Sequence, residues 1–238
     1  MRPALALILV LLPAATALAA EPWPHLDRTS MGADAFVLAH PEWDGRGVAI
    51  AVVDSGVDLG IPGLSTTSVG ELKVVEARDF TGQGDVVLEE LEWHQGVPVH
   101  PGGWTVTGLD RLGVDPRADD VLIGMIDEGK LAGSRAQDLD GDGHTDGRWA
   151  VACIGFEDGW RLWVDVNGNG DLSDEEAMQD YGIGHRVFAL APGGTEGRTP
   201  LVLAPTILWR EKILSLHFDD GGHGTHVAGI AAGHSLGG

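Results

Sequence analysis

The chain has 238 residues, of which 36 are Asp or Glu and 15 are Lys or Arg, so its formal net charge is −21. Such an acidic chain repels phosphate backbones, which excludes a sequence-independent nucleic-acid binder and favours divalent cations as partners. The apolar content of 43% is that of a globular protein. Cys153 is the single cysteine, so the chain can form neither an intrachain disulfide nor a cysteine-based zinc site.

Residues 1–20 have the composition of a secretory signal peptide. Arg2 gives a short basic start, residues 4–12 are apolar, and residues 17–19 form an Ala-x-Ala cleavage pattern. The apolar run is shorter than the roughly 20 residues that span a bilayer, and no later window is apolar enough to do so. The sequence therefore predicts an exported protein, secreted or periplasmic, with no membrane span once the signal is removed.

Residues 21–85 contain the first elements of an expected α/β fold. Apolar positions at helical spacing predict a short helix over residues 30–40. Residues 48–53 form a continuous apolar run that ends in an Asp-Ser-Gly turn, which is typical of a strand buried on both faces of a parallel sheet. A second strand is expected at residues 72–75.

The character of the sequence changes between residues 86 and 217. Short runs of Val, Leu and Trp alternate with turns, for example at residues 149–154 and 160–164, which predicts a mainly β insertion. Residues 218–238 then return to the α/β part of the fold. Val227, Ile230 and Ala231 share one face at helical spacing there, which predicts a buried helix over residues 223–233.

Residues 165–176 fit the twelve-residue loop of an EF-hand. Side chains with oxygen stand at loop positions 1, 3 and 5, a glycine stands at position 6 and a glutamate at position 12. Alternate residues of such a loop converge on one point, where Ca²⁺ takes six to eight oxygens. A solvated acidic turn is the alternative. The expected ligands of a structural calcium ion are Asp165, Asn167, Asn169, Asp171 through its carbonyl, and Glu176.

Residues 138–146 repeat the first half of this pattern. Four carboxylates stand at loop positions 1, 3, 5 and 9, but position 12 is Trp149, so the bidentate glutamate is missing. Calcium binding and a plain acidic turn are equally compatible with this loop. The candidate ligands are Asp138, Asp140, Asp142 and Asp146.

Asp54 and His223 are the candidate catalytic residues. Asp54 directly follows the expected strand, and the carboxyl ends of parallel strands are where such folds place their active sites. A carboxylate beside the imidazole of His223 would hold the ring's tautomer through one nitrogen, and the other nitrogen could take a proton from a nucleophile. His223 and His226 could also form half of a metal site, but Gly224 replaces the glutamate that zinc peptidases carry at that position.

At these residues the chain resembles the subtilisin-like serine peptidases. Val-Val-Asp-Ser-Gly-Val-Asp around Asp54 looks like their aspartate motif, and His-Gly-Thr-His-Val-Ala-Gly from His223 looks like their histidine motif. Within that group, residues 41–48 and the long separation of the two motifs are similar to the tripeptidyl-peptidase II family. The resemblance implies an incomplete subtilisin-like, doubly wound parallel sheet and a peptide or protein substrate. It also implies that Asp54 is the orienting acid and His223 the general base.

The chain departs from the pattern of that family at the nucleophile. The family's serine lies in a Gly-Thr-Ser motif well downstream of the histidine, and no Gly-Thr-Ser occurs in these 238 residues. We therefore expect a polypeptide truncated before the serine, which is inactive alone and needs a downstream fragment that carries this residue. The alternative is a non-catalytic, exported calcium-binding protein in which the peptidase motifs serve only as a scaffold.

Overall fold

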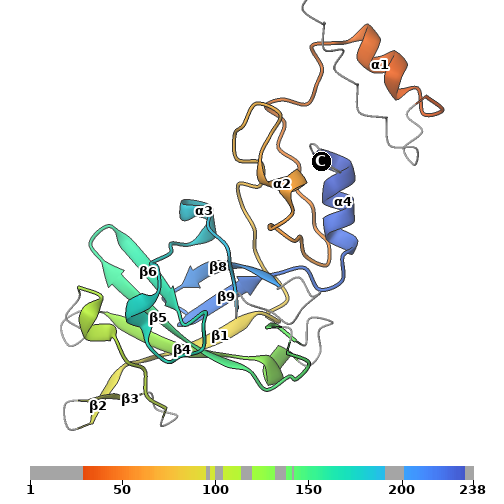
Figure 1. The fold of residues 1–238 in the computed structure, drawn as a ribbon. Coiled ribbons are helices and arrows are strands. Elements are labelled where there is room, and N and C mark those ends of the chain that lie inside the picture. Colours follow the sequence, from red (N-terminus) through yellow and green to blue (C-terminus); the bar gives the residue numbers. More distant parts are fainter. Residues whose placement is uncertain are drawn as a thin grey trace, which may run out of the picture. The chain divides into compact units, whose positions relative to one another are not determined.

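The computed structural model describes residues 29–94, 97–99, 104–113, 120–131, 138–140, 142–190 and 201–233, and the expected signal peptide lies outside this part. The chain divides into two compact units, one ending at Ala49 and the other beginning at Ile50. The first unit contains helix α1 (Ala33–Ala39), which lies within the helix expected at residues 30–40 (Figure 1). After α1, the ring of His40 stacks on Trp43 with centroids 4.4 Å apart.

A seven-stranded antiparallel sheet dominates the second unit (Figure 1). Its strand order is β6-β5-β4-β1-β9-β8-β7, and each pair of neighbours is antiparallel. A separate two-stranded hairpin consists of β2 (Glu92–His94) and β3 (Val97–Val99). The strands of the large sheet are β1 (Asp85–Glu90), β4 (Val121–Asp127), β5 (Arg148–Phe156), β6 (Gly159–Val164), β7 (Phe188–Ala189), β8 (Val202–Leu208) and β9 (Ile213–His217).

The first and last strands of this sheet are direct neighbours. Asp85 of β1 lies opposite Ser215 of β9. On its other side, β1 pairs with β4, where Leu88 lies opposite Gly124. A Cβ atom on Gly124 would come within 2.8 Å of the Val87 carbonyl oxygen, so the close approach of the two strands requires a glycine there.

Both faces of the sheet are covered, which explains the continuous apolar runs in its sequence. Val151 and Cys153 of β5 face one core, and the alternating Ala150 and Ala152 face a second. Cys153 is fully buried, and this burial raises the pKa of its thiol to about 12. The strands expected at residues 149–154 and 160–164 therefore correspond to β5 and β6.

The residues expected to form a parallel sheet do not do so in the described part of the chain. Residues 48–53 are extended, but they pair with none of the described strands, and Val53 is 93% exposed. In residues 72–75, only Leu72 forms a bridge, to Thr66. A strand in a parallel sheet obtains its backbone hydrogen bonds from neighbouring strands. The observed sheet is antiparallel and offers none to residues 48–53, so the expectation of a doubly wound parallel sheet is not confirmed.

Helix α4 (His223–Ala232) begins at the expected residue, but its buried face differs from the expected one. Gly224 and Ala228 are its buried residues, whereas Ile230 is 61% exposed. The reason is that Gly224 lets α4 lie against the turn after Asp54, which sets the inward face of the helix. The remaining short helices are α2 (Pro62–Ser65), α3 (Tyr181–Gly184), η1 (Leu109–Arg111), η2 (Glu128–Leu131) and η3 (Leu172–Asp174).

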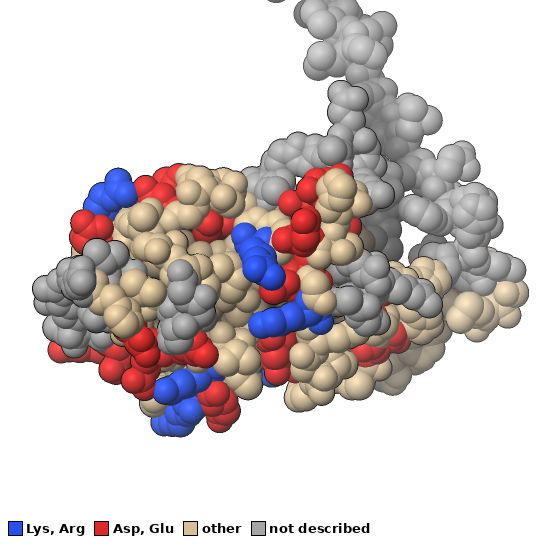
Figure 2. Space-filling view, turned by 90° about the horizontal axis from the view of Figure 1, so that it is seen from below, with Lys and Arg blue, Asp and Glu red and all other residues tan. Residues whose placement is uncertain are grey.

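Acidic side chains predominate on one face of the described residues (Figure 2). On the face shown in Figure 2, Lys and Arg side chains are few and lie beside Asp and Glu, so the described residues of this face form no basic patch. Exposed ion pairs such as Lys212 with Glu90, 2.7 Å apart, contribute little to stability, because solvent screens both charges. No helix of the described residues is long and apolar enough to cross a bilayer.

Candidate active site

The structure brings Asp54 and His223 into direct contact. Nδ1 of His223, the first residue of α4, lies 2.7 Å from Oδ1 of Asp54, although the two residues are 169 positions apart. The side chain of Asp54 is only 18% exposed, whereas that of His223 is 71% exposed. The carboxylate is therefore shielded, and the imidazole is presented to solvent.

The contact defines the protonation of both groups. The hydrogen bond to His223 is the main reason why the pKa of Asp54 lies below its ordinary value, and the backbone N–H of Ser55 adds a second hydrogen bond at 2.8 Å. An ionised carboxylate can only accept, so Nδ1 of His223 carries the hydrogen. In the neutral ring, Nε2 then has a free lone pair that can take a proton.

Glycines bring the two segments within reach of each other. A Cβ atom on Gly224 would lie 2.0 Å from the Gly56 carbonyl oxygen, and one on Gly56 would lie 1.9 Å from the Phe218 carbonyl oxygen. Gly56 also has φ +108°, which side-chain-bearing residues rarely adopt. His217 adds a further contact, because its Nε2 lies 3.2 Å from the backbone nitrogen of Val57. The Asp-Ser-Gly and His-Gly motifs are thus required by close backbone packing as well as by chemistry.

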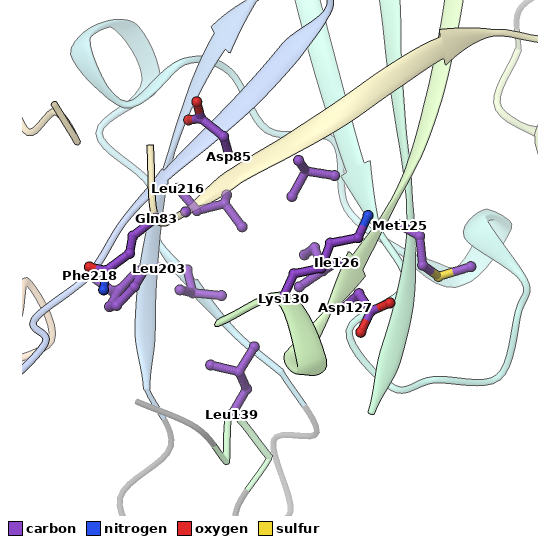
Figure 3. Close-up of a pocket in the computed structure, with 12 residues that line it drawn as sticks. Gln83, Asp85, Met125, Ile126, Asp127, Lys130, Leu139, Leu203, Leu216 and Phe218 are labelled. Carbon is purple, nitrogen blue, oxygen red and sulfur yellow. The ribbon is translucent and has the colours of Figure 1, made fainter. Parts of the chain in front are cut away.

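A small pocket lies away from this pair. It is lined by apolar side chains that include Ile126, Leu203 and Phe218, with Asp127 and Lys130 beside them (Figure 3). About 20 Å³ is open to water-sized molecules, enough for about one water. This space is too small for a peptide, so the pocket is not a substrate site.

The loop at residues 165–176 brings together most of its expected ligands. Asp165 is 3% exposed, and its two oxygens accept the backbone N–H groups of Asn169 and Gly170 at 3.0 and 2.9 Å. The amides of Asn167 and Asn169 both donate to Oδ2 of Asp174, at 3.2 and 2.9 Å. A carboxylate at loop position 10 therefore lies where the expected ligands converge.

Two expected ligands of this loop make other contacts. Glu176 is exposed and forms an ion pair with Arg186 outside the loop. Its neighbour Glu175 points inward instead and accepts the backbone N–H of Val166 at 2.9 Å. The Asp171 side chain pairs with Arg111 at 2.6 Å, which leaves its predicted carbonyl role untouched.

The loop at residues 138–146 contains a carboxylate cluster that includes a residue from outside it. Ligand atoms of Glu128, Asp138 and Asp140 all lie within 4.8 Å of one another. Glu128 is 1% exposed, and its oxygens accept the backbone N–H groups of Leu139 at 2.5 Å and Gly147 at 2.8 Å. Asp142 accepts the N–H of His144 at 2.7 Å. Asp142 and Asp146 are exposed and are not part of this cluster.

Sequence reasoning missed the roles of Glu128, Asp174 and Asp219. Glu128 directly follows an apolar strand, so a carboxylate at the strand end was the available signal. Asp174 belongs to an acidic run in which the loop pattern favoured Glu176 instead. Asp219 gave no signal, since its hydrogen bonds to Gly221, Gly222 and Thr225 depend on the start of α4.

Comparison with known proteins places the chain among relatives of the subtilisin-like peptidases. No family model matches the chain. Its homologues over most of its length are tripeptidyl-peptidase II and pyrolysin, at 24–29% identity. The "Tripeptidyl-peptidase 2" of Oryza sativa subsp. japonica is 26% identical over 270 aligned positions, which cover 87% of this chain and 20% of that protein. The "Pyrolysin" of Pyrococcus furiosus is 29% identical over 216 positions, which cover 81% of this chain and 15% of that protein.

A solved structure has a fold similar to that of this chain. The crystal structure of tripeptidyl peptidase 2 matches 84% of this chain and 20% of its own, with a TM-score of 0.59 and 23% identity. The curled antiparallel sheet is thus part of a known architecture. The chain spans about a fifth of the length of the rice relative.

Proposed function

We propose that this chain supplies the acid and the base of a subtilisin-like serine peptidase. The observation that carries the proposal is the 2.7 Å contact between Asp54 and His223, formed by two motifs of that family. In this role, Asp54 orients the ring of His223 and stabilises the imidazolium, while Nε2 accepts the proton of an attacking serine hydroxyl. The reaction is the hydrolysis of a peptide bond through an acyl-serine.

The proposal includes a separate source of the nucleophile. The 238 residues contain no Gly-Thr-Ser motif. Without the serine, a triad retains only the small rate enhancement that binding and other groups provide. The serine would therefore come from a polypeptide segment that is not part of these residues, and the present chain alone would be inactive.

A fluorophosphonate probe, which labels activated serines, tests this proposal. The chain alone should remain unlabelled. The DNA beyond codon 238 is then translated, and any product with a Gly-Thr-Ser motif is co-expressed with the chain. Labelling of that product should require both Asp54 and His223, so Asp54→Ala and His223→Ala should abolish it, whereas His94→Ala should not. Equal labelling with and without His223 would contradict the proposal.

The substrate class follows from the relatives and is part of the proposal. Their name describes peptidases that release tripeptides, which implies recognition of a free N-terminus. A complex of the two polypeptides that has not been treated with the probe should therefore cleave a tripeptide amide with a free amine and spare the N-acetylated form. Equal cleavage of both would indicate an endopeptidase instead.

We propose Ca²⁺ as a structural ion for the two acidic loops. Hard cations prefer carboxylate and amide oxygens, and the buried Asp165 lies with Asn167, Asn169 and Asp174 in the first loop. In the second loop, Glu128 takes the place of the glutamate that loop position 12 lacks, beside Asp138 and Asp140. If the peptidase proposal fails, calcium binding in an exported, non-catalytic protein is the remaining candidate function. Export itself is proposed from residues 1–20 alone.

A further inference from the structure

Hydrogen bonds between two short segments hold Asp54 and His223 together. Residues 48–58, which carry Asp54, pair with none of the described strands. The segment before α4 instead contacts them through its backbone, because the N–H of Asp220 donates to the Ser55 carbonyl oxygen at 3.1 Å. The position of Asp54 relative to His223 therefore depends on a small number of specific contacts.

Thr225 makes one of these contacts from the first turn of α4. Its Oγ1 accepts the backbone N–H of Asp58 at 2.7 Å and lies in hydrogen-bond contact with Oδ2 of Asp219. An ionised carboxylate can only accept, so the single hydrogen of the hydroxyl points to Asp219. The lone pairs of Oγ1 are then left for Asp58. Asp219 thus determines that Thr225 acts as an acceptor toward the segment of Asp54.

Asp219 is itself anchored at the start of α4. Its Oδ1 accepts the backbone N–H groups of Gly221 at 2.9 Å and Gly222 at 2.7 Å. These amides belong to the turn that leads into His223, so one carboxylate connects this turn, the Thr225 hydroxyl and, through it, Asp58. The half-buried side chain of Asp219 is well suited to hold this geometry.

We propose that Asp219 is a positioning residue for the Asp54–His223 pair. By orienting the hydroxyl of Thr225 toward Asp58, it fixes the segment of Asp54 against the helix of His223. Its importance for catalysis rests on the proposed peptidase function, whereas the hydrogen-bond geometry can be tested without it.

Three variants isolate the direction of the hydrogen bond at Thr225. Asp219→Asn can still accept from Gly221 and Gly222, but it places an N–H₂ group opposite the hydroxyl, which competes with the N–H of Asp58. Thr225→Val removes the hydroxyl at nearly constant shape, and Thr225→Ser retains it. Asp34→Asn is the control, because the Asp34 carboxylate also accepts from a threonine hydroxyl, that of Thr29, in another part of the fold.

NMR of the ¹⁵N-labelled, 238-residue chain provides two readouts. The exchange rate of the Asp58 amide reports the hydrogen bond to Thr225. The ¹⁵N shifts of His223 and its Nδ1-bound proton report the contact with Asp54, a signature that a general loss of stability would not move in a folded chain. Asp219→Asn and Thr225→Val should speed Asp58 exchange roughly tenfold, as expected for the loss of about one hydrogen bond, and should weaken the Nδ1–H signal. Thr225→Ser and Asp34→Asn should resemble the wild type.

Unchanged signals in folded Asp219→Asn and Thr225→Val would overturn the proposal. So would faster Asp58 exchange with an unchanged His223 signal, because the contact would then not position the pair. If Asp219→Asn does not fold, the comparison of Thr225→Val with Thr225→Ser tests the proposal. Equal Asp58 exchange rates and equal His223 signals in these two variants would then overturn it. No serine is needed for these readouts, so failure of the peptidase proposal leaves them valid. Conversely, the probe could label a co-expressed polypeptide with the serine as fully beside Asp219→Asn as beside the wild type. That result would contradict only the positioning role of Asp219.

Discussion

The imidazole of His223 is largely exposed, whereas the carboxylate of Asp54, 2.7 Å from its Nδ1, is mostly shielded from solvent. This difference in exposure suits a pair in which an acid orients a base. The acid needs a constant charge and one constant partner, and the base needs a free nitrogen that faces incoming groups.

We expect the Asp54 carboxyl to titrate below the ordinary aspartate pKa of about 3.9, because the hydrogen bond to His223 lowers its pKa. A carboxyl whose pKa is lower in the folded state stabilises the fold above the unfolded value, and this contribution is lost as the pH falls from there through the folded value. His223→Ala should therefore raise the pKa of Asp54 toward the ordinary value. Carboxyl ¹³C NMR measures this shift.

The control for this titration is His94→Ala, which removes a similar His–carboxylate pair with Glu92 on the exposed hairpin. It should leave the titration of Asp54 unchanged. An Asp54 pKa that does not respond to His223→Ala would contradict the pairing of the two residues.

Glu128 should make stability depend on pH in the opposite sense. Burial is the main reason why its pKa is raised, and the nearby Asp138 and Asp140 add to the effect. In chelator, its stabilising contribution is therefore complete below the unfolded value of about 4.3 and is lost as the pH rises through the folded value. Glu128→Gln should flatten the melting temperature between pH 4 and 7, and Glu90→Gln, on an exposed side chain, should not. Identical pH profiles for Glu128→Gln and the wild type would contradict this.

Removal of the Glu128 carboxylate should also cost stability. Glu128→Ala leaves the buried-loop amides of Leu139 and Gly147 without their acceptor, which costs about 1–3 kcal/mol. Urea denaturation in chelator measures this loss. A change below about 0.5 kcal/mol would show that water replaces the carboxylate at both amides.

Calcium should stabilise the fold through Asp165 and Asp174. For a Kd of about 10⁻³ M, typical of extracellular sites, 10 mM calcium adds about 1.4 kcal/mol, or about 3–6 °C in Tm. Asp165→Asn or Asp174→Asn should remove much of the gain from this loop. Glu176→Gln should have little effect, because Glu176 pairs with Arg186 outside the loop. Loss of the gain in Glu176→Gln alone would show that Glu176 leaves Arg186 to bind the ion.

Gly224→Ala should separate Asp54 from His223. The new methyl group would meet the Gly56 carbonyl oxygen and lie 3.1 Å from Cβ of Asp54, so α4 would have to move away. The Nδ1–H signal of His223 should weaken although alanine favours helix formation by about 1 kcal/mol. A stabilised chain with an unchanged His223 signal would show that the backbone accommodates the methyl group.

The elements that were predicted from the sequence are those with a local signal. The apolar runs at residues 149–154 and 160–164 become strands because both faces of the sheet are buried, and α4 begins at His223 after two glycines. Residues 48–53 have an equally strong strand pattern, yet they pair with none of the described strands. Apolar composition specifies burial, but strand formation also requires a neighbouring backbone, which the local sequence does not reveal.

The candidate site residues also differ in whether the local sequence reveals their contacts. Asp54 and His223 lie in short motifs whose glycines are needed for their contact, so the pair could be inferred from the residues themselves. Glu128 acts through the backbone amides of Leu139 and Gly147, and no spacing in the sequence connects it with them. Asp219 accepts from the nearby amides of Gly221 and Gly222, but its contact with the Thr225 hydroxyl depends on the start of α4. Likewise, Glu175 rather than Glu176 faces the loop at residues 165–176 because Arg186, ten residues away, pairs with Glu176.

The adjacency of β1 and β9 has a consequence for how this polypeptide could change over evolution. Because Asp85 lies opposite Ser215, the chain leaves and rejoins the region of Asp54 and His223 at neighbouring points. Loops between those points that make no contact with residues 50–84 can therefore lengthen or shorten without altering the distance between Asp54 and His223. A shortened graft that joins the two ends by a tight hairpin and keeps His217, which contacts Val57, should therefore preserve the contact between Asp54 and His223.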